Sequence, residues 1–253
     1  MVIHGGVDGY SRLIVFLKCS TNNRADTVLQ QFLLGAERFR VPLRIRTDHG
    51  TENIEVARWM LDHFGVVNRP VLTGMSVHNQ RIERMWVDVY KCVLEHYRNI
   101  FLFLEDQEYL ERDDELHLYT LHFVYVPRIN VALSDMAAQW NNHPLSTERN
   151  LSPLQLWIRG FYMYASSDGS TVQDLLDHTN INWDRYGIDD FGPDPRLQTN
   201  NHVVVPRSSI ELNADEYEWL CNQINPLNDD GNFGVTVYNS CRDAVGYILT
   251  QRN

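Results

Sequence analysis

Long apolar runs are absent from this sequence. No stretch approaches the roughly 18 consecutive apolar residues that a membrane-spanning helix needs. The opening residues, Met1-Val2-Ile3-His4-Gly5-Gly6, also lack the basic and apolar regions of a signal peptide. We therefore expect a protein that is neither held in a membrane nor secreted.

Closely spaced cysteines are absent too. The four cysteines lie far apart and form no Cys-x-x-Cys pair: Cys19, Cys92, Cys221 and Cys241. This spacing argues against a zinc ribbon and fits the reduced thiols of a cytoplasmic or nuclear protein. The ten histidines offer no convincing zinc ligands, since even His117 and His122 stand five positions apart.

An excess of basic residues, the usual mark of a nucleic-acid binder, is missing as well. The net charge is −11 over 253 residues, and it is unevenly spread. Residues 1–164 hold 17 basic and 19 acidic side chains, whereas residues 165–253 hold 5 and 14. Composition thus predicts a nearly balanced domain at 1–164, followed by an acidic, mainly helical C-terminal region at 165–253. The charge of the second part suggests a protein partner more than DNA.

The expected elements follow the order strand, helix, strand, helix, strand and then several helices. Apolar residues cluster or alternate in the strand segments and recur every three or four positions in the helical ones. Pro127 is expected to break one helical stretch in two. This order predicts an α/β fold in which helices pack on a sheet. After a short strand end at 4–8, strands are expected at 11–19, 41–47 and 66–72, and helices at 25–39, 53–64, 79–103, 116–126, 128–140, 172–178, 214–224 and 235–249.

Three acidic residues stand where metal ligands are often placed. Asp8 follows a strand end, Asp48 ends the strand at 41–47, and Glu83 lies in the first turns of the helix at 79–103. A few convergent carboxylates suffice for Mg²⁺, because this ion prefers oxygen ligands and keeps several waters. A single Asp or Glu is more commonly a helix cap or a surface charge, so these residues alone do not establish an enzyme.

The sequences around two of these acids resemble the retroviral-type integrase catalytic core. This is the DDE family of transposases and integrases, which has a ribonuclease-H-like fold. Thr-Asp-His-Gly-Thr-Glu at 47–52 resembles the family's second-aspartate motif, and Asn-Gln-Arg-Ile-Glu-Arg at 79–84 resembles the helix of its catalytic glutamate. The 34 residues between Asp48 and Glu83 are one fewer than the family's usual spacing. The segments at 140–145 and 151–157 resemble the end of many transposon integrase cores, so the resemblance covers about residues 2–160.

The resemblance implies a transposon-derived protein of DNA integration, with Asp48 and Glu83 as catalytic residues that bind Mg²⁺ or Mn²⁺. The family's reaction is direct in-line attack on a phosphodiester, by water in 3′-end processing and by the freed hydroxyl in strand transfer. DNA is then the partner, and a homo-oligomer is expected because two DNA ends are joined together. A nuclear location is implied, with a cytoplasmic one as the alternative.

The sequence differs from the family pattern at the first catalytic aspartate. In the family that residue lies on an opening strand, whereas Val-Asp-Gly-Tyr-Ser-Arg at 7–12 matches the strand that follows it. We therefore expect a ribonuclease-H-like mixed sheet that lacks its first strand and exposes an edge. Asp8 is expected to accept hydrogen bonds from the backbone near Tyr10 and Ser11 rather than to bind metal.

Other functions remain open beside the integrase core. A transposon-derived module that binds DNA or protein without catalysis is one, and a metal-dependent nuclease without strand transfer is another. Candidate DNA contacts recur at near-helical spacing on the helix of Glu83, where an ordinary solvated face explains them equally well: Arg81, Arg84, Lys91 and Arg98. His49 and Asn79 flank the acids and are candidates to orient a water or a phosphate.

Overall fold

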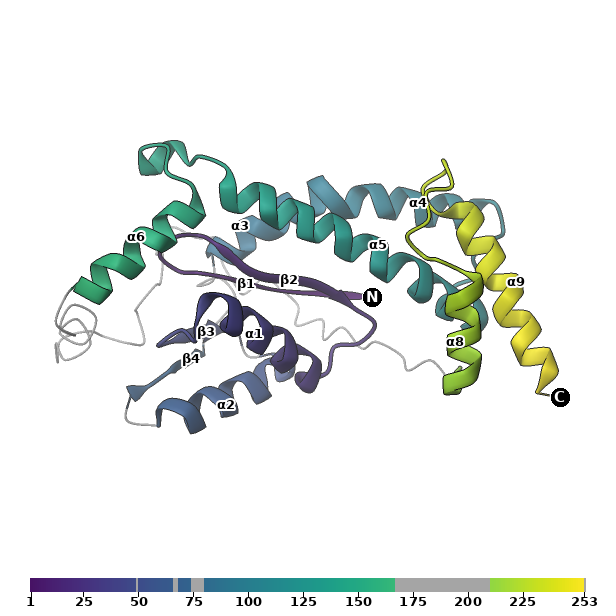
Figure 1. Cartoon of the computed structure of the whole chain (residues 1–253), viewed down its shortest axis with the longest axis horizontal. Coiled ribbons are helices and arrows are strands. Elements are labelled where there is room, and N and C mark those ends of the chain that lie inside the picture. Colours follow the sequence, from purple (N-terminus) through teal and green to yellow (C-terminus); the bar gives the residue numbers. More distant parts are fainter. Residues whose placement is uncertain (49, 66–67, 74–79, 167–209, 253) are drawn as a thin grey trace, which may run out of the picture.

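The structure is a computed structural model that describes residues 1–48, 50–65, 68–73, 80–166 and 210–252. Figure 1 shows helices packed around two small sheets, so the expected α/β class is confirmed. Within the described ranges, no helix is both long and apolar enough to cross a membrane.

The first sheet is an antiparallel pair near the N-terminus. Strand β1 (Val2–Val7) pairs with β2 (Ile14–Ser20), with Val2 opposite Ser20 and Gly6 opposite Phe16. β-branched, aromatic and other apolar residues favour β2 as a strand. The connecting turn is closed by two backbone hydrogen bonds, from Asp8 N to Leu13 O at 2.8 Å and from Arg12 N to Asp8 O at 3.0 Å. The strand end expected at 4–8 is therefore a full strand.

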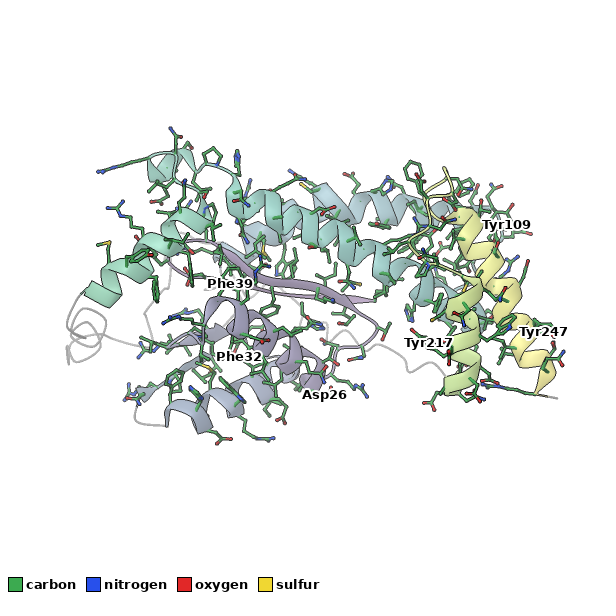
Figure 2. All side chains as sticks on the ribbon, in the orientation of Figure 1. Asp26, Phe32, Phe39, Tyr109, Tyr217 and Tyr247 are labelled. Atoms are coloured by element: carbon green, nitrogen blue, oxygen red, sulfur yellow. The ribbon has the colours of Figure 1, made fainter. Side chains whose placement is uncertain are left out.

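The second sheet is a parallel pair of short strands. Strand β3 (Ile45–Thr47) pairs with β4 (Val71–Thr73), and η1 (Thr51–Asn53) and α2 (Ile54–Phe64) lie between them in the chain. Helix α1 (Ala25–Phe39) packs on α2 through a buried cluster of Val28, Phe32, Val56 and Met60. Phe32 lies on the side of α1 that faces α2 (Figure 2).

The single mixed sheet that the resemblance implies is present as two separate pairs. Among the described residues, β1 pairs only with β2 and β3 pairs only with β4. Joining the two pairs into one sheet would need a strand hydrogen-bonded to an edge of each, and no described segment pairs in this way. Consequently β1 and β3 each keep one edge without a partner strand in the described part of the chain.

The other edge of β2 is closed by two asparagine side chains of α5 (Glu115–Asn142). Asn130 accepts from Cys19 N at 2.8 Å and donates to Cys19 O at 3.1 Å. Asn141 bonds Ile14 N and O in the same way, at 2.8 and 3.0 Å. Eleven helical residues and five strand residues each span about 16 Å, so the helix matches the strand in length. The side-chain amides thus replace a neighbouring strand and protect the edge.

A long helical hairpin forms the larger core. It begins with α3 (Gln80–Val89), the π-helical turn η4 (Tyr90–Leu94) and α4 (Glu95–Asp106), and returns through α5. The expected break at Pro127 is wrong, because α5 continues through it. Packing on both sides of the proline outweighs the lost hydrogen bond. The fully buried hydrophobic residues of this hairpin are Val89, Leu104, Val124, Tyr125 and Leu133.

The C-terminal helices complete the molecule. After η5 (Ser146–Glu148), α6 (Pro153–Ser166) packs on the end of α1, where the rings of Trp157 and Phe39 meet edge-on at 5.7 Å. Helices α8 (Ala214–Gln223) and α9 (Val235–Gln251) confirm two expected helices, and the helix expected at 172–178 lies outside the described residues. Tyr238 of α9 is fully buried and donates to Tyr109 O at 3.2 Å, at the far end of the hairpin (Figure 2).

Candidate functional site

Asp48 directly follows β3 and is held by the loop that leads into α2. Its Oδ1 accepts hydrogen bonds from Gly50 N at 3.2 Å and from Asn53 Nδ2 at 3.0 Å. Both donors use the same oxygen, so within the described residues Oδ2 is left for another partner. Asn53 and Gly50 therefore fix the orientation of the carboxylate.

Glu83 lies in the first turn of α3, which packs on the face of β1 at Gly5. A Cβ at Gly5 would lie 3.0 Å from Trp86 and 3.2 Å from Met85, so the glycine permits this close approach. Partial desolvation raises the pKa of the Glu83 carboxyl, and the negative charge of Asp48 raises it further. The negative charge of Asp48 therefore disfavours ionisation of Glu83, which is the direction expected for two acids that would share a cation.

Asp8 has its carboxylate engaged in its own turn. Its Oδ2 accepts from Ser11 N at 2.7 Å, Ser11 Oγ at 2.7 Å and Tyr10 N at 3.2 Å. The local hydrogen bonding expected from the sequence is confirmed. Among the described residues, Asp8, Asp48 and Glu83 do not form a group whose ligand atoms all lie within 4.8 Å of one another.

Glu52 is a further acid of the loop that follows Asp48, and the sequence analysis did not single it out. It lies in η1, and its carboxylate packs against Gly50. A Cβ added to Gly50 would lie only 2.2 Å from Glu52 Oε1. On β1, His4 is 8% exposed and its Nε2 lies 3.4 Å from Asn22 O. Burial lowers the pKa of His4, while that hydrogen bond and the charge of Glu52 act in the opposite direction.

The candidate DNA contacts are exposed residues of the helical stretch formed by α3, η4 and α4. Arg81, Arg84, Lys91 and Arg98 are all exposed, and Arg84 lies 3.7 Å from Asp88. The π-helical turn contains Lys91 and changes the phase of the residues that follow it. Arg98 accordingly lines a cavity beside β1, together with side chains of α4. The four cations therefore lie on one continuous helical stretch, but they do not all lie on the same face of it.

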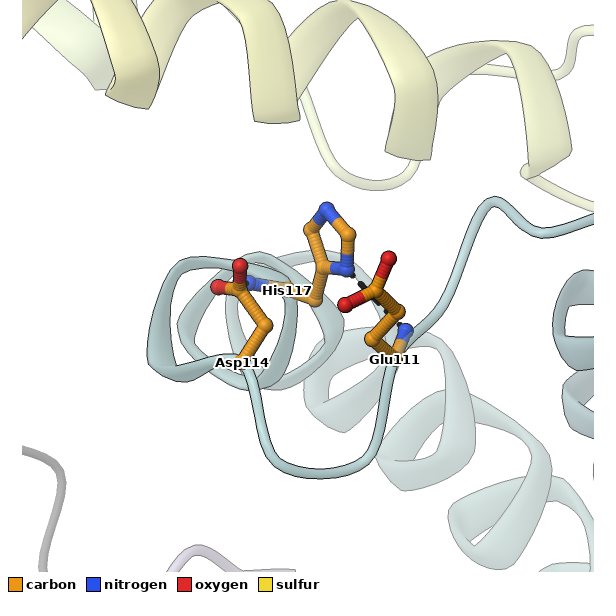
Figure 3. A group of neighbouring side chains, drawn as sticks. All are labelled: Glu111, Asp114 and His117. Carbon is orange, nitrogen blue, oxygen red and sulfur yellow. Dashed lines mark hydrogen bonds between the residues drawn. The ribbon is translucent and has the colours of Figure 1, made fainter.

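A second group of possible ligands lies at the turn between α4 and α5 (Figure 3). Ligand atoms of Glu111, Asp114 and His117 lie within 4.8 Å of one another. Asp114 Oδ1 caps α5, accepting from Leu116 N at 2.8 Å and His117 N at 3.1 Å, and Glu111 N donates to His117 Nδ1 at 3.0 Å. The positive end of a helix opposes a cation here. These contacts explain the group as a helix cap.

His49 and Asn79, the two polar neighbours of the acids, lie outside the described residues. Their expected roles in orienting a water or a phosphate remain predictions.

Comparison with known families gives one match. A family model described as "Integrase core domain" matches residues 1–171. The matched range includes both sheets, the helices through α6, and Asp8, Asp48, Glu52 and Glu83. No curated protein and no solved structure matches the chain.

Proposed function

The chain belongs to the integrase core family, and on that basis we propose that it is a polynucleotidyl transferase core that acts on DNA phosphodiesters with a divalent metal ion. The ribonuclease-H-like arrangement, in which helices cover small sheets, agrees with this membership. The proposed reaction is DNA end processing followed by strand transfer, as in integration and transposition.

The effect of the Asp48 charge on Glu83, which raises the pKa of the Glu83 carboxyl, is the observation that supports this function best. The donor set fits Mg²⁺ or Mn²⁺, since both ligands are carboxylates, and the loop at 50–53 holds only one oxygen of Asp48. Asp48 and Glu83 would hold the ion. When bound, the metal supplies charge stabilisation for the in-line displacement at phosphorus.

The residues around the pair have a positioning role. Gly50 and Asn53 orient the carboxylate of Asp48, and the contact of Gly5 with Trp86 sets the place of Glu83 on α3. Family membership implies DNA as the partner. We propose that the phosphate backbone is contacted by Arg81, Arg84, Lys91 and Arg98. We also propose that the protein forms a homo-oligomer and that its acidic C-terminal region binds a protein partner. Its proposed location is nuclear or cytoplasmic.

One observation favours a second candidate, a module that binds DNA or protein without catalysis. Asp8 already accepts three hydrogen bonds within its turn, so it is poorly suited to complete the family's triad of acids. Two carboxylates are few for two metal ions. A protein limited to them would bind DNA but cleave it poorly.

The two candidates are distinguished by an assay on end-labelled DNA with the full chain in Mg²⁺ or Mn²⁺. The proposed function predicts metal-dependent cleavage or joining, reduced at least about a hundredfold by Asp48→Asn or Glu83→Gln. Asp62→Asn on α2 and Glu95→Gln on α4 change exposed carboxylates and serve as matched controls. DNA binding without cleavage would support the inactive module. Cleavage that survives both site substitutions would contradict the proposed site.

A further inference from the structure

We propose that a cavity between the first sheet and α4 receives an unpaired nucleotide of the DNA substrate, with the base inside the cavity and a phosphate on Arg98. The inference rests on the proposed function and adds to it the form of DNA end that the protein prefers. The cavity has a volume of about 600 Å³, within the range of about 300–1,000 Å³ that is usual for small-molecule sites.

The walls of the cavity are mainly apolar and aromatic. Ile3 of β1 and its cross-strand neighbour Cys19 of β2 line it from the sheet. Tyr97 and Phe101 line it from α4, both half-buried, with their ring centroids 6.4 Å apart. Aromatic side chains beside a positive charge are the usual platform for unpaired bases, because every base has a π face that stacks on them.

The two rings of α4 are held in place by the core. Tyr125 of α5 is fully buried and meets Tyr97 edge-on at 6.3 Å and Phe101 edge-on at 5.1 Å. Because these contacts already fix the rings, an entering base does not have to order them, which lowers the entropy cost of binding.

The charge of the cavity suits a phosphate. Three charged side chains line it, and two of them, Glu105 and Arg112, neutralise each other through two hydrogen bonds of 2.6 Å each. The third, Arg98, forms no ion pair with a described residue. The cavity therefore carries one uncompensated guanidinium, a group whose fork of N–H donors matches phosphate oxygens.

The cavity lies close to the proposed metal site along the same helical stretch. Trp86 lines it and comes three residues after Glu83, on the same face of α3. Leu94, a further lining residue, lies 11 residues after Glu83, which is roughly 16 Å of helix or about five stacked nucleotides. A DNA strand that reacts at Glu83 thus reaches the cavity within a few nucleotides. The competing occupant is an apolar side chain of a protein partner, for which Arg98 would have no role.

The test measures the affinity of the full chain for two labelled DNAs by fluorescence anisotropy, without metal ion so that nothing is cleaved. Both are the same duplex with a five-nucleotide overhang, which carries bases in one DNA and is abasic in the other. The two DNAs thus differ in bases but not in phosphates. Tyr97→Leu and Phe101→Leu remove a ring from the cavity. Tyr97→Phe keeps the ring, and Phe103→Leu removes an exposed ring of α4 that does not line the cavity.

We expect the wild type to bind the overhang with bases at least about fivefold more tightly than the abasic one. Tyr97→Leu and Phe101→Leu should bring the two affinities close together, while Tyr97→Phe and Phe103→Leu keep the difference. Arg98→Gln should weaken the binding of both DNAs several-fold. Circular dichroism should show folded protein throughout.

Equal affinity of the wild type for both overhangs would overturn the inference and leave the proposed function standing. A difference that persists in Tyr97→Leu and Phe101→Leu, or unchanged affinities in Arg98→Gln, would leave the cavity to a protein side chain and also overturn it. An equal loss in Phe103→Leu would assign the effect to α4 as a whole, with the same consequence. A wild type that binds neither DNA would contradict the proposed function itself.

Discussion

The charge of Glu83 opposes folding when no metal is bound. Partial desolvation and the repulsion from Asp48 raise the pKa of its carboxyl above the usual 4.5, so the folded state binds this proton more tightly than the unfolded state. The penalty is absent below about pH 4.5, where both states are protonated. It grows as pH rises through the folded pKa and is complete above it.

Glu83→Gln is therefore expected to raise the melting temperature at pH 7 without metal, by a few degrees at most. The gain should disappear near pH 4, and Glu95→Gln should give no such pattern. Thermal melts followed by circular dichroism between pH 4 and pH 8 provide the measurement. A Glu83→Gln variant that is destabilised at pH 7 would show that the two acids do not repel.

Single residues differ in how well the sequence reveals them. Local motifs single out Asp48 and Glu83 as candidate ligands and predict the turn role of Asp8. The Asp8 role was predictable because its hydrogen-bond donors lie two and three residues further along the chain. The position of Glu52 depends on the absent Cβ of Gly50 and on a strand far away in the sequence, so no local pattern indicates it.

At the scale of elements, α5 protects β2 with side-chain amides. Removing Asn130 leaves Cys19 N and O without their partners at a buried strand edge, which costs about 1–3 kcal/mol. Asn130→Ala and Asn141→Ala should each lower stability by such an amount in chemical denaturation. Asn142→Ala is the control, since this exposed side chain bonds only its own helix at Ala138 O. Equal stability of all three variants would contradict the proposed role of the edge.

The exposed cations of α3 and η4 lead to a prediction about DNA affinity. If Arg81 and Lys91 contact phosphates, each change to glutamine should weaken DNA binding several-fold. It should also reduce the slope of log affinity against log salt by about 1. Arg58→Gln on α2 alters an equally exposed cation that pairs with Glu55 and should leave the slope unchanged. Titrations at several salt concentrations measure this, and unchanged slopes in the first two variants would assign both cations to a solvated face.

The elements themselves were largely predictable from apolar periodicity. Helix α1 was expected at its observed bounds, and α2 ends at Phe64, the last residue of the expected helix. Two failures share a physical cause. Pro127 stays within α5, and β1 is longer than its own residues suggest, because packing stabilises the first and pairing with β2 and packing against α3 stabilise the second.

For the whole molecule, the C-terminal helices share the core of the hairpin. Tyr238 and Val245 of α9 are fully buried in the same cluster as Val124 and Tyr125 of α5. The division of the chain into a domain at 1–164 and a region at 165–253 remains a prediction. Because the two parts share a core, the stability of the first part alone tests it.

Removal of α8 and α9 would expose that apolar surface to water. We expect a fragment of residues 1–164 to melt at least several degrees below the full chain and to bind a hydrophobic dye. Thermal melts and dye fluorescence of both proteins measure this difference. A fragment as stable as the full chain would show instead that 1–164 folds independently, as the division predicts.

The split sheet is also a property of the whole molecule that the sequence revealed only in part. A lost strand was expected from the surroundings of Asp8, but the separation into two pairs depends on where the strands are placed in space. Such placement arises from long-range packing, which local periodicity does not report.

The most direct test of the proposed metal site is a crystal structure of the full chain with Mn²⁺, located by its anomalous scattering. We predict the strongest peak between the carboxylates of Asp48 and Glu83, with ligand oxygens about 2.1–2.2 Å from the ion. An absence of density there, or a peak only at Glu111, Asp114 and His117, would contradict it.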